Sequence, residues 1–156
     1  MDHIPRQIVA TALDLAPDDL PPGDLPVARL AEYWHRDLVL MAADREVPAH
    51  WASDLILTLP EHAPEPAWAT IRATLDLCTT PEEVAVLAAG PTEDLIGHHG
   101  AAMIDRIAAD AAASARVRYL LSGVWQAETP ALLWARIEAA RAGGPALDDG
   151  DPLPPV

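Results

Sequence analysis

The sequence contains no lysine and no phenylalanine, and it has a single cysteine among its 156 residues. One cysteine, Cys78, excludes an internal disulfide, and its position in an apolar helical run predicts a buried, unreactive thiol. No stretch reaches the roughly 18 consecutive apolar residues of a membrane span. The first residues lack the cationic region and apolar run of a secretory signal. We therefore expect a cytoplasmic protein that does not associate with membranes.

The charge is strongly one-sided. The chain contains ten arginines and 24 acidic residues, which gives a formal net charge of −14 at pH 7. Nucleic-acid binding requires a basic footprint on the phosphate backbone, so this charge argues against a nucleic-acid partner. It permits rapid, electrostatically steered association with a basic protein partner. The alternative is that the acidic surface only keeps the protein in solution.

The composition and the apolar spacing predict an all-α fold. Alanine and leucine are strong helix formers, and strand-forming residues never cluster with a period of two. Most of the 16 prolines fall at helix starts or between helices, where they are tolerated. The predicted helices span residues 5–15, 27–46, 48–59, 67–78, 81–90, 91–113, 114–126 and 130–143, with loops at 16–26 and 60–66.

Short connections favour antiparallel neighbours. We therefore expect a single domain over residues 1–143, built as a bundle of about seven to eight short helices in antiparallel hairpins. Residues 144–156 are acidic and rich in proline, which predicts a disordered tail. Nothing in the sequence indicates the oligomeric state.

The clearest local signal is the stretch TTPEEVAVLAAG. Thr80 is the predicted N-cap, with Pro81 in the first helical position and Glu83 completing a capping box. Gly90 is the predicted left-handed residue that closes this helix. Thr129 and Pro130 repeat the cap-and-proline pattern near the C-terminus.

The stretch GPTEDLIGHHGAAMID, residues 90–105, concentrates acids and histidines on one predicted helix. At 100° per residue, a core-facing side collects the apolar residues of this helix, which are Leu95, Ile96, Met103 and Ile107. Asp94, His98 and Asp105 fall on the opposite side. Asp94 one turn before His98 suits an oriented imidazole, as in a general base or a metal ligand. The other interpretation is an exposed helix start, where the helix dipole favours Glu93 and Asp94.

Three further polar residues of this helix, His99, Arg106 and Asp110, fall on the apolar side. Buried polar groups need partners. They therefore form either an internal network that fixes helix packing, or one wall of a cleft where His99 and Arg106 reach a ligand. Gly97 and Gly100 indicate a kinked helix or the close approach of another helix.

No motif assigns a catalytic residue, a metal or a cofactor. The chain has no H-E-x-x-H, no C-x-x-C, no phosphate loop and no nucleophile elbow. The candidate functional residues are therefore those of the 93–110 helix alone: Glu93, Asp94, His98, His99, Arg106 and Asp110.

The segments VAVLAAGPTEDLIGHHGAAMIDRI and RVRYLLSGVW resemble an uncharacterised bacterial domain family of unknown function. The resemblance rests on L-A-A-G-P-x-E-D-L at residues 87–95, His99-Gly100, and L-x-G-V-W at residues 121–125, and it covers roughly residues 30–126. It implies a small helical domain and no established activity. It directs attention to Glu93, Asp94 and His99.

Three functions remain open. The favoured one is a small acidic protein-interaction module, such as an immunity or antidote-like protein or an adaptor, because the chain is short, acidic and free of catalytic motifs. The second is a metal-dependent or acid–base enzyme centred on the 93–110 helix. The third is a structural component without activity, with Trp34, Trp51 and Trp125 including exposed interface anchors.

Overall fold

The structure, a computed structural model, describes all residues from 1 to 156 and confirms the all-α class. The helices are α1 (Arg6–Ala12), α2 (Val27–Ala42), α3 (Trp51–His62), α4 (Pro64–Leu77), α5 (Pro81–Leu87), α6 (Glu93–Ala113), α7 (Ala115–Ser122) and α8 (Ala131–Arg141). A 3-10 turn, Pro17–Asp19, and a π-helical turn, Ala88–Thr92, complete the helical part. The short strands β1 (His3–Ile4) and β2 (Leu25–Pro26) pair in antiparallel fashion, with Ile4 opposite Leu25.

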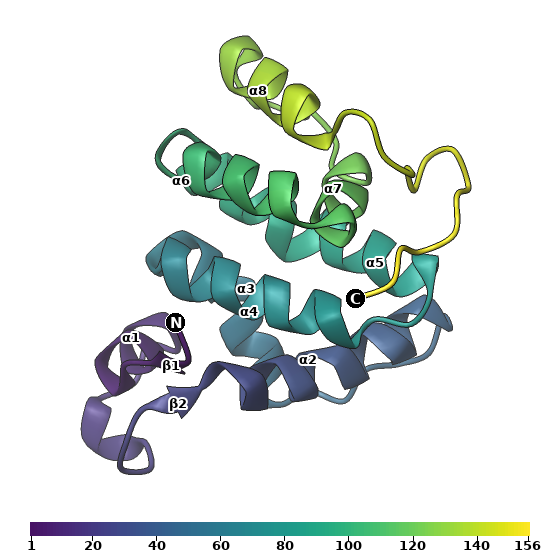
Figure 1. Ribbon diagram of the computed structural model, residues 1–156. Coiled ribbons are helices and arrows are strands. Elements are labelled where there is room, and N and C mark those ends of the chain that lie inside the picture. The colour runs from purple at the N-terminus through teal and green to yellow at the C-terminus, as the bar shows by residue number, and fades with distance from the viewer.

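The helices are stacked in layers. Figure 1 shows α2 at the bottom, α3 and α4 above it, then α5 to α7, and α8 at the top. Helix α2 packs on α4 and α5, and α6 packs on α3, α4, α7 and α8. Helix α6 therefore connects the lower layers to the upper ones, and its side chains decide how the two halves meet. No helix combines the length and the apolar character needed to cross a membrane.

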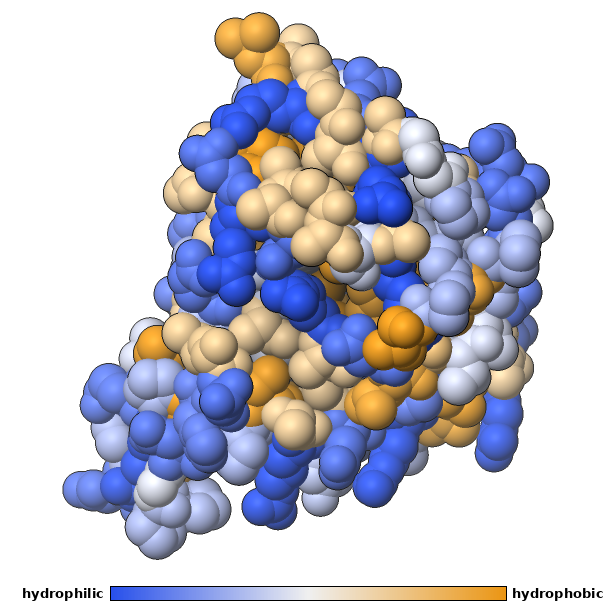
Figure 2. Space-filling model, in the orientation of Figure 1, coloured by the Kyte–Doolittle hydropathy of each residue, from blue (hydrophilic) through white to orange (hydrophobic).

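A single connected core of 32 buried residues extends from Ile4 to Ile137. Two tryptophans, Trp34 and Trp68, are almost fully buried, with 2% and 1% of their surface exposed. The interpretation of Trp34 as an exposed anchor is therefore wrong, whereas Trp51 and Trp125 do reach the surface. Figure 2 shows a surface on which hydrophilic and weakly hydrophobic residues alternate, notably over α8.

The predicted loop at residues 60–66 is wrong, because the structure makes most of it helical. Helix α3 continues through the buried Pro60 to His62, and only Ala63 separates it from α4. Pro64 and Pro66 lie in the first turn of α4. Proline is accepted there because the first amides of a helix have no intrahelical partner to lose.

Two helices end earlier than predicted, at aspartates in the left-handed conformation. Asp14 follows α1 with φ 53°, and Asp44 follows α2 with φ 52°. In each case the next amide bonds back across the helix end, from Leu15 to the Ala10 carbonyl and from Arg45 to the Leu40 carbonyl. This six-to-one bond is the Schellman closure, normally built on glycine. Aspartate adopts the same conformation more easily than most residues, which explains the shorter helices.

The C-terminal helices also begin and end differently from the prediction. Helix α7 ends at Ser122 rather than residue 126, and α8 begins at Ala131 without a side-chain cap from Thr129. Ser114 caps α7 as predicted, since its hydroxyl accepts the Val117 amide hydrogen.

Residues 144–156, for which the sequence predicts disorder, form no helix or strand and return along one side of the stack (Figure 1). The Tyr119 hydroxyl donates to the Asp151 carbonyl at 2.7 Å, and the Leu147 amide donates to the Ser122 hydroxyl at 2.8 Å. Leu147 and Leu153 pack against the core. The structure thus places this segment against α7.

The two glycines of α6 have different surroundings. Helix α6 is continuous, and a Cβ on Gly100 would lie 2.7 Å from Leu133 Cδ2 of α8, whereas a Cβ on Gly97 would meet nothing within 4 Å. The sequence predicted either a kinked helix or the close approach of another helix at these glycines. The structure shows close approach, and only at Gly100.

This difference predicts that replacement by alanine changes the free energy of unfolding differently at the two glycines. Gly97→Ala should raise the free energy of unfolding by about 0.5–1 kcal/mol, because alanine is the better helix former. Gly100→Ala should not raise the free energy of unfolding, because the new methyl group must displace the Leu133 side chain. Urea denaturation of both variants measures the difference, and equal stabilisation by both would contradict the close packing of α8 on α6.

Candidate functional site

Helix α6 has the two faces that the sequence predicts. Leu95, Ile96, Met103 and Ile107 are all buried, whereas Asp94, His98 and Asp105 are exposed. No hydrogen bond joins Asp94 to His98, so the oriented imidazole expected from their spacing is not formed. The ring centroids of His98 and His99 lie 6.4 Å apart.

The junction between α5 and α6 is a helix break without a loop. Gly90 was predicted to be left-handed, but it has φ −112° and ψ −109°, and the π-helical turn Ala88–Thr92 carries the chain directly into α6. The Leu87 carbonyl would normally accept the amide hydrogen of residue 91, but Pro91 has none. The buried Thr92 hydroxyl replaces it and donates to the Leu87 carbonyl at 2.8 Å.

Glu93, the first residue of α6, connects this break to a distant part of the chain. Its Oε1 accepts the backbone amide hydrogen of Trp125 at 2.9 Å. The bond fixes the start of the connection between α7 and α8, while the Trp125 side chain remains 73% exposed. Sequence reasoning considered Glu93 and Trp125 separately. Glu93 and Trp125 both lie in motifs of the family that the sequence resembles, and this was the one signal in the sequence that linked them.

His99 lies between helices rather than in a cleft. Its Nε2 is 2.7 Å from the carbonyl oxygen of Glu61, in the last turn of α3. Because a carbonyl can only accept, this nitrogen carries the hydrogen and donates it. His99 thus links α6 to α3, as one of the two predicted alternatives proposed.

Arg106 and Asp110 meet at the contact between α4 and α6. Asp110 accepts hydrogen bonds from Trp68 Nε1 at 2.8 Å and Arg106 Nε at 3.1 Å, and Arg72 Nη1 lies 3.1 Å away. Burial alone would raise the pKa of Asp110, but the bonds from Trp68 and Arg106 and the charge of Arg72 outweigh it and hold the pKa below its ordinary 3.8. The predicted network exists, with Trp68 and Arg72 as members that the sequence did not indicate. It lies at the edge of the helix contact rather than in the interior, because the side chains of Arg106 and Arg72 are 51% and 40% exposed.

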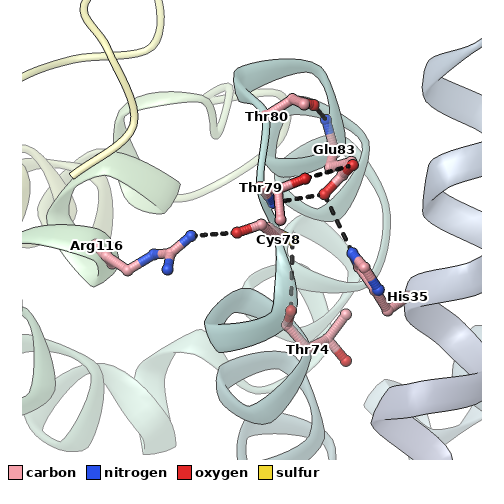
Figure 3. Close-up of polar contacts among 7 residues, drawn as sticks. All are labelled: His35, Thr74, Cys78, Thr79, Thr80, Glu83 and Arg116. Carbon is pink, nitrogen blue, oxygen red and sulfur yellow. Dashed lines mark hydrogen bonds and ion pairs between the residues drawn. The ribbon is translucent and has the colours of Figure 1, made fainter. Parts of the chain in front are cut away.

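A second buried carboxylate, Glu83, holds the turn between α4 and α5 (Figure 3). It accepts the Thr79 amide hydrogen at 2.7 Å and a hydrogen bond from His35 Nε2 of α2 at 3.2 Å. Burial raises the pKa of Glu83, but the bonds from Thr79 and His35 outweigh burial and lower the pKa below 4.5. Thr80 caps α5 as predicted, through the Glu83 amide. The reciprocal bond goes to Thr79 rather than Thr80, which corrects the predicted capping box.

Cys78 and Arg116 flank the same turn. The Cys78 thiol donates to the Thr74 carbonyl at 3.4 Å, and burial together with the charge of Glu83 raises its pKa to about 12. The thiol is therefore protonated at neutral pH, which agrees with the predicted inert cysteine. The buried Arg116 of α7 donates to the Cys78 carbonyl from the opposite side to His35 (Figure 3).

A third cluster joins α2 to the start of α3. The buried Asp37 accepts hydrogen bonds from His50 Nε2 at 2.9 Å and from the Ser53 hydroxyl at 2.6 Å. These residue types also form hydrolase triads, but there the aspartate and the serine contact different ring nitrogens. Here both lie beside Nε2, the serine donates to the aspartate, and Nδ1 has no partner. The arrangement anchors the segment before α3 and does not activate Ser53.

The structure therefore places the predicted site residues at different points of the fold rather than in one site. Arg106 and Asp110 come together, whereas Glu93 and His99 each contact a different element, and Asp94 and His98 face solvent. No three histidine, cysteine, aspartate or glutamate side chains form a group that could hold a metal ion. The residue that stands out beside Glu93 is the exposed Trp125.

The Asp110 network predicts a pH-dependent stability. A lowered folded-state pKa stabilises the fold above the unfolded value of 3.8, and this stabilisation is lost as pH falls through the folded-state pKa. Asp110→Asn should reduce the free energy of unfolding at pH 7 by about 2 kcal/mol, because charged hydrogen bonds are weakened. The difference in the free energy of unfolding between this variant and the wild type should become smaller as the pH falls below 3.8.

Denaturant titrations at several pH values measure this difference, and Asp105→Asn is the matched control on the same helix. Asp105 is 88% exposed and pairs with Arg136 at the surface, so its loss should change stability by less than about 1 kcal/mol. Equal effects of the two substitutions, or a difference that does not depend on pH, would contradict the assigned role of Asp110.

Comparison with known proteins identifies a family and assigns no activity. Residues 41–144 match the family described as "Family of unknown function (DUF6869)". No curated protein and no solved structure matches the chain. The matched residues include the α5–α6 junction, Glu93 and Trp125, and leave out α1 and all but the end of α2. Because the match covers more than half of the sequence, the chain belongs to this family of unknown function.

Proposed function

We propose that the protein is an interaction module that binds a basic protein partner through the Trp125 surface. This surface consists of the exposed residues of segment 125–132 together with Glu93 and Asp94. The exposure of Trp125 carries the proposal, because 73% of a large aromatic side chain lies in solvent. Tryptophan is among the residues that most often dominate the binding energy of protein interfaces.

The Glu93 bond makes this exposure a defined feature of the fold. A side chain on an unrestrained loop would have to be ordered at a cost when a partner binds. Here the Trp125 amide is already held by the first residue of a long, well-packed helix. The anchor is therefore partly positioned before binding, which favours affinity.

The neighbouring residues favour a cationic partner. Leu132 is a second exposed apolar residue of this segment, at 86%, and Asp94 and Glu128 are exposed carboxylates close in sequence to Glu93 and Trp125. A net charge of −14 steers basic proteins toward the molecule. An apolar anchor with an acidic rim matches the usual division of an interface into a desolvated centre and a polar edge.

The backbone of segment 125–132 also carries local strain. Ala127 has φ 42°, in the left-handed region, without the polar side chain that helps aspartate to adopt it. Such strain persists where the surrounding structure imposes it, and it concentrates at binding and switch regions. An immunity, antidote-like or adaptor role fits this description. The enzyme hypothesis has no comparable support, because Glu93, His99 and Asp110 each hold a different element.

The proposal predicts that Trp125→Ala abolishes most binding without unfolding the protein. A basic partner recovered with the wild-type protein from cells that produce it should be purified and titrated calorimetrically. Loss of a central anchor should raise Kd by about 30-fold or more, which corresponds to roughly 2 kcal/mol. Unchanged thermal unfolding of the variant shows that the fold is intact.

The matched control is Leu57→Ala, which removes another exposed apolar side chain, 60% exposed, from α3. Its Kd should stay within about twofold of wild type, since scattered exposed apolar residues carry little binding energy. Recovery of no stoichiometric partner, or a partner bound equally well by the Trp125 variant, would refute the proposal.

A further inference from the structure

We propose that a pocket in the N-terminal part of the chain binds a small carboxylic acid with an apolar tail. The pocket has a volume of about 370 Å³ and lies between α1, the segment 13–26 and the first residue of α3. It lies almost entirely in residues that precede the family match, and Trp51 is its one matched residue. It is therefore independent of the Trp125 surface and of the function proposed for it.

The walls of the pocket suit an apolar tail. Val9 and Leu13 of the α1 region, Leu15 and Leu20 of the following segment, and the indole of Trp51 line it, together with several prolines. Trp51 is fixed by an edge-on contact with Tyr33, with ring centroids 5.3 Å apart. Small-molecule sites are concave and mainly apolar, with a few polar groups that orient the ligand. This pocket has that composition and falls at the lower end of the usual volume range.

Two arginines, Arg6 and Arg29, line the pocket and supply its positive charges. Arg29 forms no ion pair, although the chain carries 24 acidic residues. Arg6 donates from Nη2 to the Leu20 carbonyl at 2.7 Å, and its Nε has no partner. Arg6 is thus occupied by the Leu20 carbonyl and paired with Asp18 at 3.9 Å, and its Nε is buried. Arg29 has no carboxylate partner, so its charge remains available to an anion.

The local charges select a monoanion. Asp24 also lines the pocket, but its Oδ1 already accepts the Arg6 amide hydrogen at 3.0 Å. The fully exposed Asp18 lies 3.9 Å from Arg6 Nη2. The lining carries Arg6, Arg29 and Asp24, and Asp18, outside the lining, pairs with Arg6, so Arg29 is the arginine that lacks a carboxylate partner. A monoanionic carboxylate balances Arg29, whereas a doubly charged phosphate would be repelled by the two aspartates.

The test is isothermal titration of the full chain with octanoate, below the concentration at which it forms micelles, against octan-1-ol and octylammonium. Octanoate should bind at one saturable site, at least about tenfold more tightly than the alcohol, since a charged hydrogen bond to arginine is added. Octylammonium should not bind. Absence of saturable octanoate binding, or equal binding of the alcohol, would overturn the proposal.

Two pairs of variants locate the site. Arg29→Gln should weaken octanoate binding by about tenfold, whereas Arg45→Gln removes the same charge outside the pocket and should leave Kd within about twofold. Leu15→Asn should weaken the binding of octanoate, whereas Leu57→Asn should not. All four residues are exposed, so each variant should fold. Equal effects within either pair would place the binding elsewhere and overturn the assignment.

Discussion

The missing amide hydrogen of Pro91 is the constraint on which the upper half of the molecule depends. Pro91 cannot bond to the Leu87 carbonyl and disfavours a helical conformation at the preceding Gly90, where the helix breaks, and the Thr92 hydroxyl donates to that carbonyl instead. The break is tight enough that α6 begins at once, with Glu93 as its first residue. Glu93 then holds the Trp125 amide, which sets the path of the chain between α7 and α8. The junction at Gly90 and Pro91 therefore leads directly to the carboxylate that holds the amide of the exposed tryptophan.

Three carboxylates, two buried and one partly buried, give the layers of the stack their positions. Asp37 ties α3 to α2, Glu83 ties the α4–α5 turn to α2, and Asp110 ties α6 to α4. Each accepts several hydrogen bonds, which removes the penalty of burying a carboxylate and fixes how the helices approach. The acidity of the chain thus has two parts. A few acids organise the interior, and the many exposed ones give the surface its charge.

Features that depend on neighbouring residues were predictable, and those that depend on distant ones were not. The core face of α6, the Thr80 cap and the inert Cys78 follow from local spacing and composition. The pairing of Glu83 with His35 joins residues that are 48 positions apart, and that of Glu93 with Trp125 joins residues 32 apart. No local pattern encodes such pairs. The sequence did not indicate the left-handed helix ends at Asp14 and Asp44, because such ends are usually formed by glycine and here they are formed by aspartate.

The central claim is that the Glu93 carboxylate holds Trp125 at the surface, and hydrogen exchange of the Trp125 amide, followed by NMR, tests it most directly. An amide held in a hydrogen bond exchanges its hydrogen with solvent more slowly than a free one. The Trp125 amide should therefore be protected in the wild type and should lose this protection in Glu93→Ala, whereas Asp94→Ala should leave it unchanged. A Trp125 amide that is unprotected in the wild type, or equally protected in Glu93→Ala, would contradict the account.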